Sequence, residues 1–298
     1  MVTNKEYDTV IIIGAPRSGT NILRDTLCYH QSVATWPCDE INYIWKHGNL
    51  FYPSDAVPAK KASEVIRKYI RRRFDWVSQA YNAKVVVEKT CANSLRVPFV
   101  EAITNNAKYI FIVRDGIDVV GSSKIRWTSD LDLKYIIRKS RFVPFLDLPY
   151  YAWRNFLNQI FSKFSSTSQL KFWGPVLDGA NEKFKNLSLV EICAMQWKEC
   201  VEKSEEALLR INPERVLKIH YEKLVENPLP EIEKVMEFIG LNLSIKQSTL
   251  ILDSITNKNI GKGRSSLSES EVKSINSCLL YTSDAADDLL CVDLGGRR

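Results

Sequence analysis

The stretch Val10–Thr26, VIIIGAPRSGTNILRDT, decides how this chain folds. It starts with four apolar β-formers, continues through a loop that contains Gly14 and Gly19, and ends in a helical pattern with apolar residues on one face. A strand, a tight loop and a helix in this order form a phosphate cradle, because loop glycines let backbone N–H groups approach an anion and the helix N-terminus adds partial positive charge. The stretch therefore predicts an anion site in the loop, and a strand–turn–helix without a ligand is the alternative.

The loop departs from the motif of P-loop NTPases at one position. Gly14 and Gly19 have the P-loop spacing, but Thr20 stands where those proteins carry the lysine that contacts the β- and γ-phosphates. The one cation of the loop is Arg17, whose planar guanidinium suits bidentate binding of an anion. The loop therefore favours an anion held by arginine over ATP.

Composition limits the class of protein. The 298 residues suffice for one large α/β domain or two small ones, and 45% hydrophobic with 26% charged residues is typical of a globular protein. A net charge of +6 fits an anionic ligand without requiring nucleic acid. No apolar run approaches the ~18 residues of a membrane span, and the N-terminus lacks the features of a signal peptide, so we expect a cytoplasmic protein. Seven cysteines and three histidines without metal-ligand spacing predict thiols in a reducing compartment.

Alternating strand and helix patterns predict a three-layer α/β domain with a parallel central sheet. The expected strands cover residues 9–13, 32–36, 84–88, 108–113 and 216–220, and the clearest helical spacing covers residues 60–81, 187–211, 231–239 and 267–275. Residues 127–188 are rich in aromatic side chains and prolines, and we expect a lid or acceptor region there; a packing layer or an interaction surface is the alternative. Residues 278–298 look like translated sequencing-adapter sequence, so we expect the domain to end near residue 277.

Charged residues follow two of the expected strands. Asp39 and Glu40 come after the strand at 32–36, and Lys89 ends the strand at 84–88. In open parallel sheets chemistry gathers at the carboxyl ends of the strands, so one of the acids is a candidate general base beside the loop. A polar loop and a surface lysine are the plainer interpretation.

A second anion site is predicted after the strand at 108–113. Arg114 ends that strand, Ser122 lies eight residues on, about two turns into the expected helix, and Arg126 lies one turn further on the same side. Two arginines and a hydroxyl that converge in this way suit a second phosphate. Surface arginines on an ordinary strand–turn–helix are the alternative.

Two of these motifs together resemble the sulfotransferases that use 3′-phosphoadenosine 5′-phosphosulfate (PAPS). PRSGT at 16–20 resembles their 5′-phosphosulfate loop, and FIVRDGIDVVGSS at 111–123 resembles their 3′-phosphate motif. HYEKLVENP at 220–228 is also similar to that family. The resemblance covers most of residues 7–275, is nearest in detail to the branch with the protein-tyrosine sulfotransferases, and implies a P-loop-like α/β/α fold.

The resemblance also implies a role for each matching residue. Glu40 would deprotonate the acceptor hydroxyl, although it stands further from the loop than in the tyrosine enzymes, so Asp39 remains a competitor. Lys89 and Arg17 would stabilise charge on the sulfuryl group and on the leaving phosphate. The 5′-phosphosulfate would be bound by Arg17, Ser18, Gly19, Thr20 and Asn21, and the 3′-phosphoadenosine end by Arg114, Ser122, Arg126, Tyr221, Lys262 and Arg264. For Tyr221, a core tyrosine is the alternative. The last two positions match more loosely, because Gly263 replaces an aromatic residue that the family often carries there.

The predicted function is transfer of a sulfuryl group from PAPS to a hydroxyl of a small molecule, a glycan or a peptide by in-line displacement. Such a reaction needs positioning, one base and several cations, and we expect no metal because side chains supply the cations. The alternatives are a P-loop kinase or NTPase, and a PAPS-binding protein without catalysis.

Overall fold

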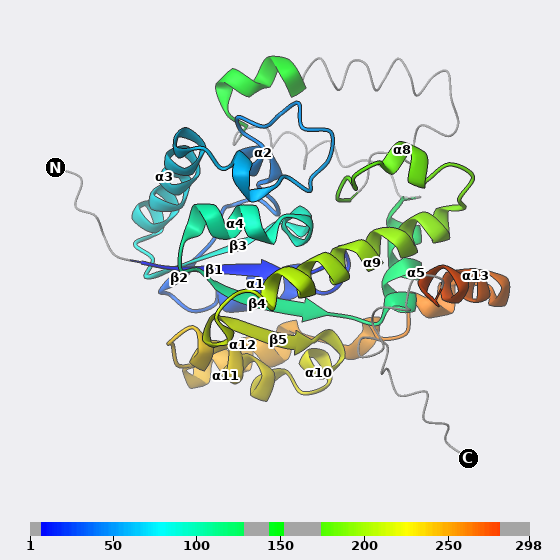
Figure 1. Ribbon diagram of the computed structural model, residues 1–298. Helices are drawn as coiled ribbons and strands as arrows, with labels where there is room; N and C mark the ends of the chain where they lie inside the picture. The colour runs from blue at the N-terminus through cyan, green and yellow to red at the C-terminus, as the bar shows by residue number, and fades with distance from the viewer. Residues whose placement is uncertain (1–6, 128–142, 152–173, 281–298) are drawn as a thin grey trace.

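The computed structural model describes residues 7–127, 143–151 and 174–280, and it confirms the predicted fold class. Five parallel strands form one sheet in the order β2-β3-β1-β4-β5 (Figure 1). Their bounds are β1 Asp8–Ile13, β2 Val33–Ala34, β3 Val85–Lys89, β4 Lys108–Val113 and β5 Val216–His220. All five lie where the sequence places them within a residue or two, although β2 is an edge strand of only two residues.

Helices cover both faces of the sheet (Figure 1). One face carries α3 (Glu64–Tyr81), α4 (Val97–Thr104) and α9 (Leu189–Leu208), and the other carries α1 (Thr20–Leu27), α10 (Tyr221–Glu226), α11 (Pro228–Phe238) and α12 (Ile245–Ser254). Because side chains alternate along a strand, β1 serves both layers: Ile11 and Ile13 pack in the first core, Val10 and Ile12 in the second. Strands buried on both faces read as the continuous apolar runs seen in the sequence.

The remaining elements lie around the carboxyl edge of the sheet and in the connections. Helix α5 (Gly116–Trp127) follows β4 and packs with α9 and α13 (Glu269–Leu280) in a third small core around Val120, Ala194 and Ile275. The short segments are α2 Asn42–Trp45, α8 Ala180–Lys183, η1 Ala59–Lys61, η2 Cys91–Leu95, η3 Phe145–Asp147, η5 Pro213–Arg215, η6 Asn257–Asn259 and η7 Arg264–Ser266.

Helix ends differ from the periodicity where a capping residue intervenes. The spacing predicts a helix from residue 60, but α3 begins at Glu64 because the Ser63 side chain accepts a hydrogen bond from the Ile66 amide. Similarly, α9 begins at Leu189 behind a capping box formed by Ser188 and Glu191. Apolar spacing does not report these boundaries.

Two predicted regions fall largely outside the described residues. The aromatic-rich region is described at 127, 143–151 and 174–188, and its other residues lie outside the described ranges, as do residues 281–298 of the expected tail. Within the described ranges, no helix combines the length and the apolar character needed to cross a membrane.

Candidate active site

The loop after β1 is shaped by one close contact. Gly19 has φ +87°, and a Cβ built there would lie 2.3 Å from Cδ2 of Tyr221. Gly19 is therefore required both by its left-handed backbone and by the ring beneath it. Tyr221 itself is 1% exposed and belongs to the second core, so its ring packs between that core and the loop.

Arg17 reaches from this loop to helix α5. Its Nε donates to Ser122 Oγ at 3.0 Å, which joins the two predicted anion motifs directly. Partial burial, followed by the positive charges of Arg114 and Arg126, lowers the pKa of Arg17. No acidic side chain of the described ranges forms an ion pair with Arg17 to offset this. We call Arg17, Arg114 and Arg126 the arginine cluster; a bound anion would relieve its mutual repulsion.

The hydroxyl of Ser18 also lacks a protein partner. Ser18 is 1% exposed, and its Oγ makes no hydrogen bond within the described part of the chain. Leaving such a group unsatisfied costs about 1–3 kcal/mol, so an anion that accepts its hydrogen would be stabilised there. The arginine cluster and this hydroxyl together fit a ligand that carries more than one negative charge.

Arg114 is held by the protein on several sides. Its Nε donates to Asp118 Oδ2 at 3.0 Å, a second short bond from Nη2 reaches the same oxygen, and further bonds reach the carbonyl oxygens of Arg17 (2.8 Å) and Asn259 (2.9 Å). Its guanidinium lies 4.2 Å from the centre of the Tyr221 ring. Arg114 thus joins the first loop to the loop at 259–266, which we call the late loop. Its contact with a 3′-phosphate stays a prediction.

Asp118 is a residue of this site that the sequence analysis does not single out. Besides Arg114, its carboxylate accepts from the amides of Gly263 at 2.7 Å and Arg264 at 3.1 Å, and it is 5% exposed. It therefore ties β4, α5 and the loop at 259–266 together. The available signal was its position four residues after Arg114 at the start of a helix, which is the spacing of an i,i+4 ion pair.

The late loop explains the departure at Gly263. A Cβ on Gly121 would lie 2.0 Å from the Gly263 carbonyl oxygen, and a Cβ on Gly263 would lie 1.9 Å from the Asp118 carbonyl oxygen. Two backbones in such contact leave no room for the aromatic residue that the resemblance leads one to expect. The side chains of Lys262 and Arg264 are exposed beside this contact, and Asn21 is exposed at the first loop.

Glu40 and Lys89, two of the candidate site residues, lie in contact. Lys89 Nζ donates to Glu40 Oε1 at 3.0 Å, and the Cys91 amide donates to the same oxygen at 3.2 Å. The Lys89 side chain is 3% exposed and the Glu40 side chain 26%. Burial alone would lower the pKa of Lys89, but Cys91 and Glu40 outweigh it and raise that pKa above its ordinary value. We call Glu40, Lys89 and Cys91 the base pocket.

Asp39 faces a different neighbour. Its carboxylate lies 3.6 Å from Nη2 of Arg24, its carbonyl accepts from Arg24 Nη1 at 2.9 Å, and its side chain is 45% exposed. Its contacts are therefore with α1, whereas those of Glu40 are with the end of β3.

Cys91 connects the base pocket with the first loop. Its Sγ lies 3.8 Å from the Thr20 hydroxyl, and its amide binds Glu40. Burial raises the pKa of this thiol. The sequence offers little signal for Cys91, because a single cysteine without metal-ligand spacing indicates no particular role.

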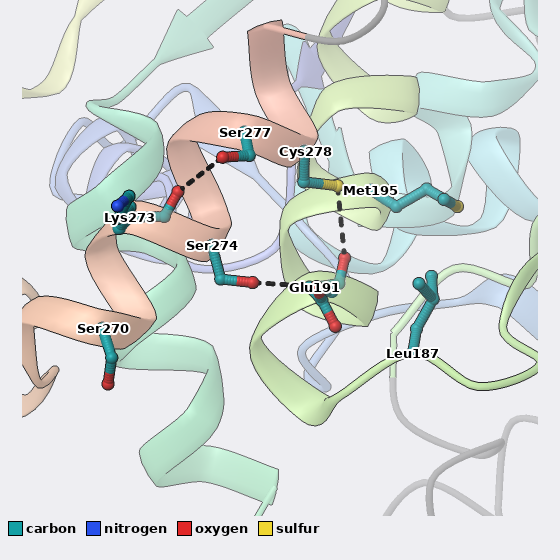
Figure 2. A pocket seen from close by; sticks show the side chains of 8 residues that line it. All are labelled: Leu187, Glu191, Met195, Ser270, Lys273, Ser274, Ser277 and Cys278. Atoms are coloured by element: carbon teal, nitrogen blue, oxygen red, sulfur yellow. Dashed lines mark hydrogen bonds between the residues drawn. The ribbon is translucent and has the colours of Figure 1, made fainter.

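A separate hollow lies between α9 and α13 (Figure 2). It has a volume of about 540 Å³, and the described residues that line it include none of the predicted site residues. Ser274 Oγ donates to Glu191 Oε1 at 2.8 Å within it, which joins the two helices. Across the described ranges, no group of three or more His, Cys, Asp or Glu side chains is arranged to hold a metal ion.

Comparison with known proteins identifies one family. The sequence matches the sulfotransferase domain family over residues 7–278. The fold is similar to a sulfotransferase domain from the curacin biosynthetic pathway, at 15% identity and a TM-score of 0.51 over 88% of this chain and 83% of that one. It is also similar to sulfotransferase STF9 from Mycobacterium avium, at 13% identity and a TM-score of 0.49 over 93% and 77% of the two chains. No curated protein matches the sequence.

Proposed function

This chain belongs to the sulfotransferase family, and we propose that it transfers the sulfuryl group of PAPS to a hydroxyl acceptor with Glu40 as the general base. One observation carries the assignment of residues. Thr20 of the first loop and Glu40 both contact Cys91, while Arg17 of the same loop contacts Ser122. Three motifs that are far apart in the sequence thus meet at the carboxyl edge of one sheet, which is where open α/β sheets bind their ligands.

The residues present fit the donor. The unpartnered Ser18 hydroxyl, the amides of the loop and Arg17 would hold the 5′-phosphosulfate. Ser122 and Arg126, with Lys262 and Arg264 of the late loop, would hold the 3′-phosphate. Arg114 would contact the 3′-phosphate as well, and Tyr221 would hold Arg114 in place, because its ring centre lies 4.2 Å from that guanidinium.

The chemistry follows from the position of each charge. When bound, PAPS would supply the sulfuryl group: its bond to the 5′-phosphate oxygen would break as the acceptor oxygen bonds to sulfur in line. Glu40 takes the proton that the acceptor hydroxyl loses. Lys89 and Arg17 are the cations that stabilise the negative charge developing on the transferring group and the leaving phosphate. Glu40 is favoured over Asp39, since only Glu40 contacts Lys89.

The acceptor class remains a small molecule, glycan or peptide with a hydroxyl group. For the location we propose the cytoplasm, supported by the observation that the six cysteines of the described ranges form no disulfide. The ATP alternative loses support because Thr20 occupies the lysine position and the family match is to sulfotransferases.

The test is transfer from ³⁵S-labelled PAPS to a panel of hydroxyl compounds by the purified chain, with binding of 3′-phosphoadenosine 5′-phosphate (PAP) measured by calorimetry. Labelled product and PAP binding are expected together. PAP binding without transfer to any acceptor would favour the non-catalytic alternative, and magnesium-dependent ATP turnover without PAP binding would favour the kinase.

A further inference from the structure

A buried carboxylate next to Lys89 has no part in the mechanism above. Glu88 is 1% exposed and, because side chains alternate along β3, it points to the face opposite Lys89. Its two oxygens accept from Thr90 Oγ1 at 2.5 Å and Asn93 Nδ2 at 2.8 Å. A carboxylate buried at this depth is costly unless its hydrogen bonds are satisfied, so its neighbours are specifically arranged.

The Thr90 hydroxyl joins Glu88 to the chain beside the base. It donates its one hydrogen to Glu88 and accepts from the Ile41 amide at 3.2 Å. A hydroxyl has a single hydrogen, so the carboxylate fixes its direction and leaves an oxygen lone pair facing Ile41. Ile41 directly follows Glu40 in the sequence.

Three consecutive residues therefore hold residues 40 and 41. Lys89 and Cys91 both donate to the Glu40 carboxylate, and Thr90, which lies between them, fixes the backbone at Ile41. The side chain of the base and the backbone that carries it are thus held by one short segment at the end of β3.

A second connection holds the next residue. Arg96 Nε donates to Asn93 Oδ1 at 2.9 Å, and its Nη2 donates to Asn42 Oδ1 at 2.6 Å. Arg96 and Asn93 are 1% and 0% exposed. The network that starts at Glu88 therefore reaches residue 42 as well, and residues 40–42 are held at each position.

We propose that Thr90 and Glu88 are positioning residues that fix Glu40 at the distance needed to take a proton from the acceptor. This inference rests on the proposed function, in which Glu40 is the base. Neither residue touches the reacting atoms. They act because general-base catalysis depends on hydrogen-bond distance, and a misplacement of about 1 Å can cost about 100-fold in rate.

The decisive variant is Thr90→Val, which keeps the shape and removes the hydroxyl. With the panel acceptor that gives the fastest wild-type turnover, we expect kcat to fall roughly 10- to 100-fold while the Kd for PAP stays within about twofold. Thr90→Ser restores the hydroxyl and should recover most of kcat. Thr104→Val is the matched control, because that hydroxyl donates to the Val100 carbonyl of α4 away from the site.

A second measurement does not need the acceptor. The titration of Glu40, followed by ¹³C NMR and assigned with Glu40→Gln, should shift in Thr90→Val and return in Thr90→Ser, because the contacts to Lys89 and Cys91 change. If Thr90→Val fails to fold, Glu88→Gln should shift the titration in the same direction. An unchanged titration and kcat in a folded variant would overturn the positioning role. Absence of transfer by the wild-type chain would instead contradict the proposed function. The Glu40 titration in the Thr90 variants would still show whether Thr90 positions Glu40.

Discussion

The arginine cluster and the base pocket balance their cations in different ways. Arg17 is partly buried next to two other arginines, so its pKa is lowered, and within the described ranges no carboxylate pairs with it. Lys89 is more deeply buried, yet its pKa is raised because Glu40 and Cys91 lie beside it. One cation is destabilised until an anion arrives, and the other is already compensated.

This difference separates binding from reaction. The uncompensated Arg17 gains most from an incoming phosphate, so the free energy of donor binding should come mainly from the arginine side. A compensated pair gains little from binding and instead holds a base in place, so its loss should appear in kcat. Arg114 differs from Arg17 in this respect, because its charge is already compensated by the ion pair with Asp118.

The largest effect expected is on the base side. Glu40→Gln removes the proton acceptor but keeps its size, so kcat should fall by about 10²–10⁴-fold with the Kd for PAP nearly unchanged. Transfer from labelled PAPS and calorimetry measure the two quantities. Asp39→Asn is the control and should keep kcat within a few-fold. Normal turnover by Glu40→Gln would show that another residue is the base, and that the arginine cluster and the base pocket do not divide binding and reaction between them.

Glu88, next to the base pocket, carries a charge that depends on pH. Burial raises the pKa of Glu88 from 4.5 to about 7, so between these values the folded chain holds a proton that the unfolded chain has lost. The contribution of this group to the free energy of unfolding is fully present below pH 4.5 and is lost as pH rises through 7. One pKa unit corresponds to about 1.4 kcal/mol, so the loss is on the order of 3 kcal/mol.

Glu88→Gln cannot ionise and should flatten the dependence of unfolding free energy on pH across this range. Urea unfolding at pH 5, 6, 7 and 8 measures it, with Glu206→Gln as an exposed control. A variant that loses stability with pH as steeply as the wild type would show that the Glu88 proton is not linked to folding.

On the arginine side, Arg17→Met should weaken PAP binding by about 10- to 100-fold, since it removes a charge-assisted contact. The stability of the unliganded chain should change little, because the variant also removes repulsion from Arg114 and Arg126. Calorimetry at two salt concentrations should show a smaller salt dependence than in the wild type. Arg72→Met on the exposed side of α3 is the control. Equal PAP affinity in Arg17→Met and the wild type would mean that the cluster binds no phosphate.

The sequence predicted the strands and the first loop well, because their signals are local. Val10–Ile13 can be recognised as a buried strand from its own residues, and Gly19 and Arg17 lie within one short loop. It was also predictable that the charged residues at the ends of β3 and β4 lie at the same edge of the sheet, since parallel strands place their carboxyl ends together.

The contacts that fix the site were not predictable in the same way, because each joins distant segments. Nothing near Asp118 in the sequence reveals Gly263, and nothing near Thr90 reveals Ile41. The choice between Glu40 and Asp39 also stayed open, because it depends on which one faces Lys89 and which faces Arg24. Polar residues whose partners lie elsewhere in the chain are visible only once the fold brings them together.

The smallest effect expected concerns the late loop, and it tests whether the contacts of Asp118 with that loop contribute to donor binding. A Cβ in Gly121→Ala would lie 2.0 Å from the Gly263 carbonyl oxygen, so the loop must move away from α5. Overpacking of this kind costs about 1–3 kcal/mol. We expect PAP affinity to fall by several-fold, because Asp118 would lose the amides of Gly263 and Arg264, while kcat with saturating donor stays close to that of the wild type.

Calorimetry and thermal unfolding separate this effect from a general loss of stability. Gly179→Ala is the control: its φ of +65° strains an added Cβ, yet no atom lies within 4 Å of it. That variant should lower the Tm without changing PAP affinity. If Gly121→Ala also left PAP affinity intact, the late loop would have no part in donor binding. Asp118 would then be a structural anchor for Arg114, and the anion would be bound through Arg17, Ser122 and Arg126 without the late loop.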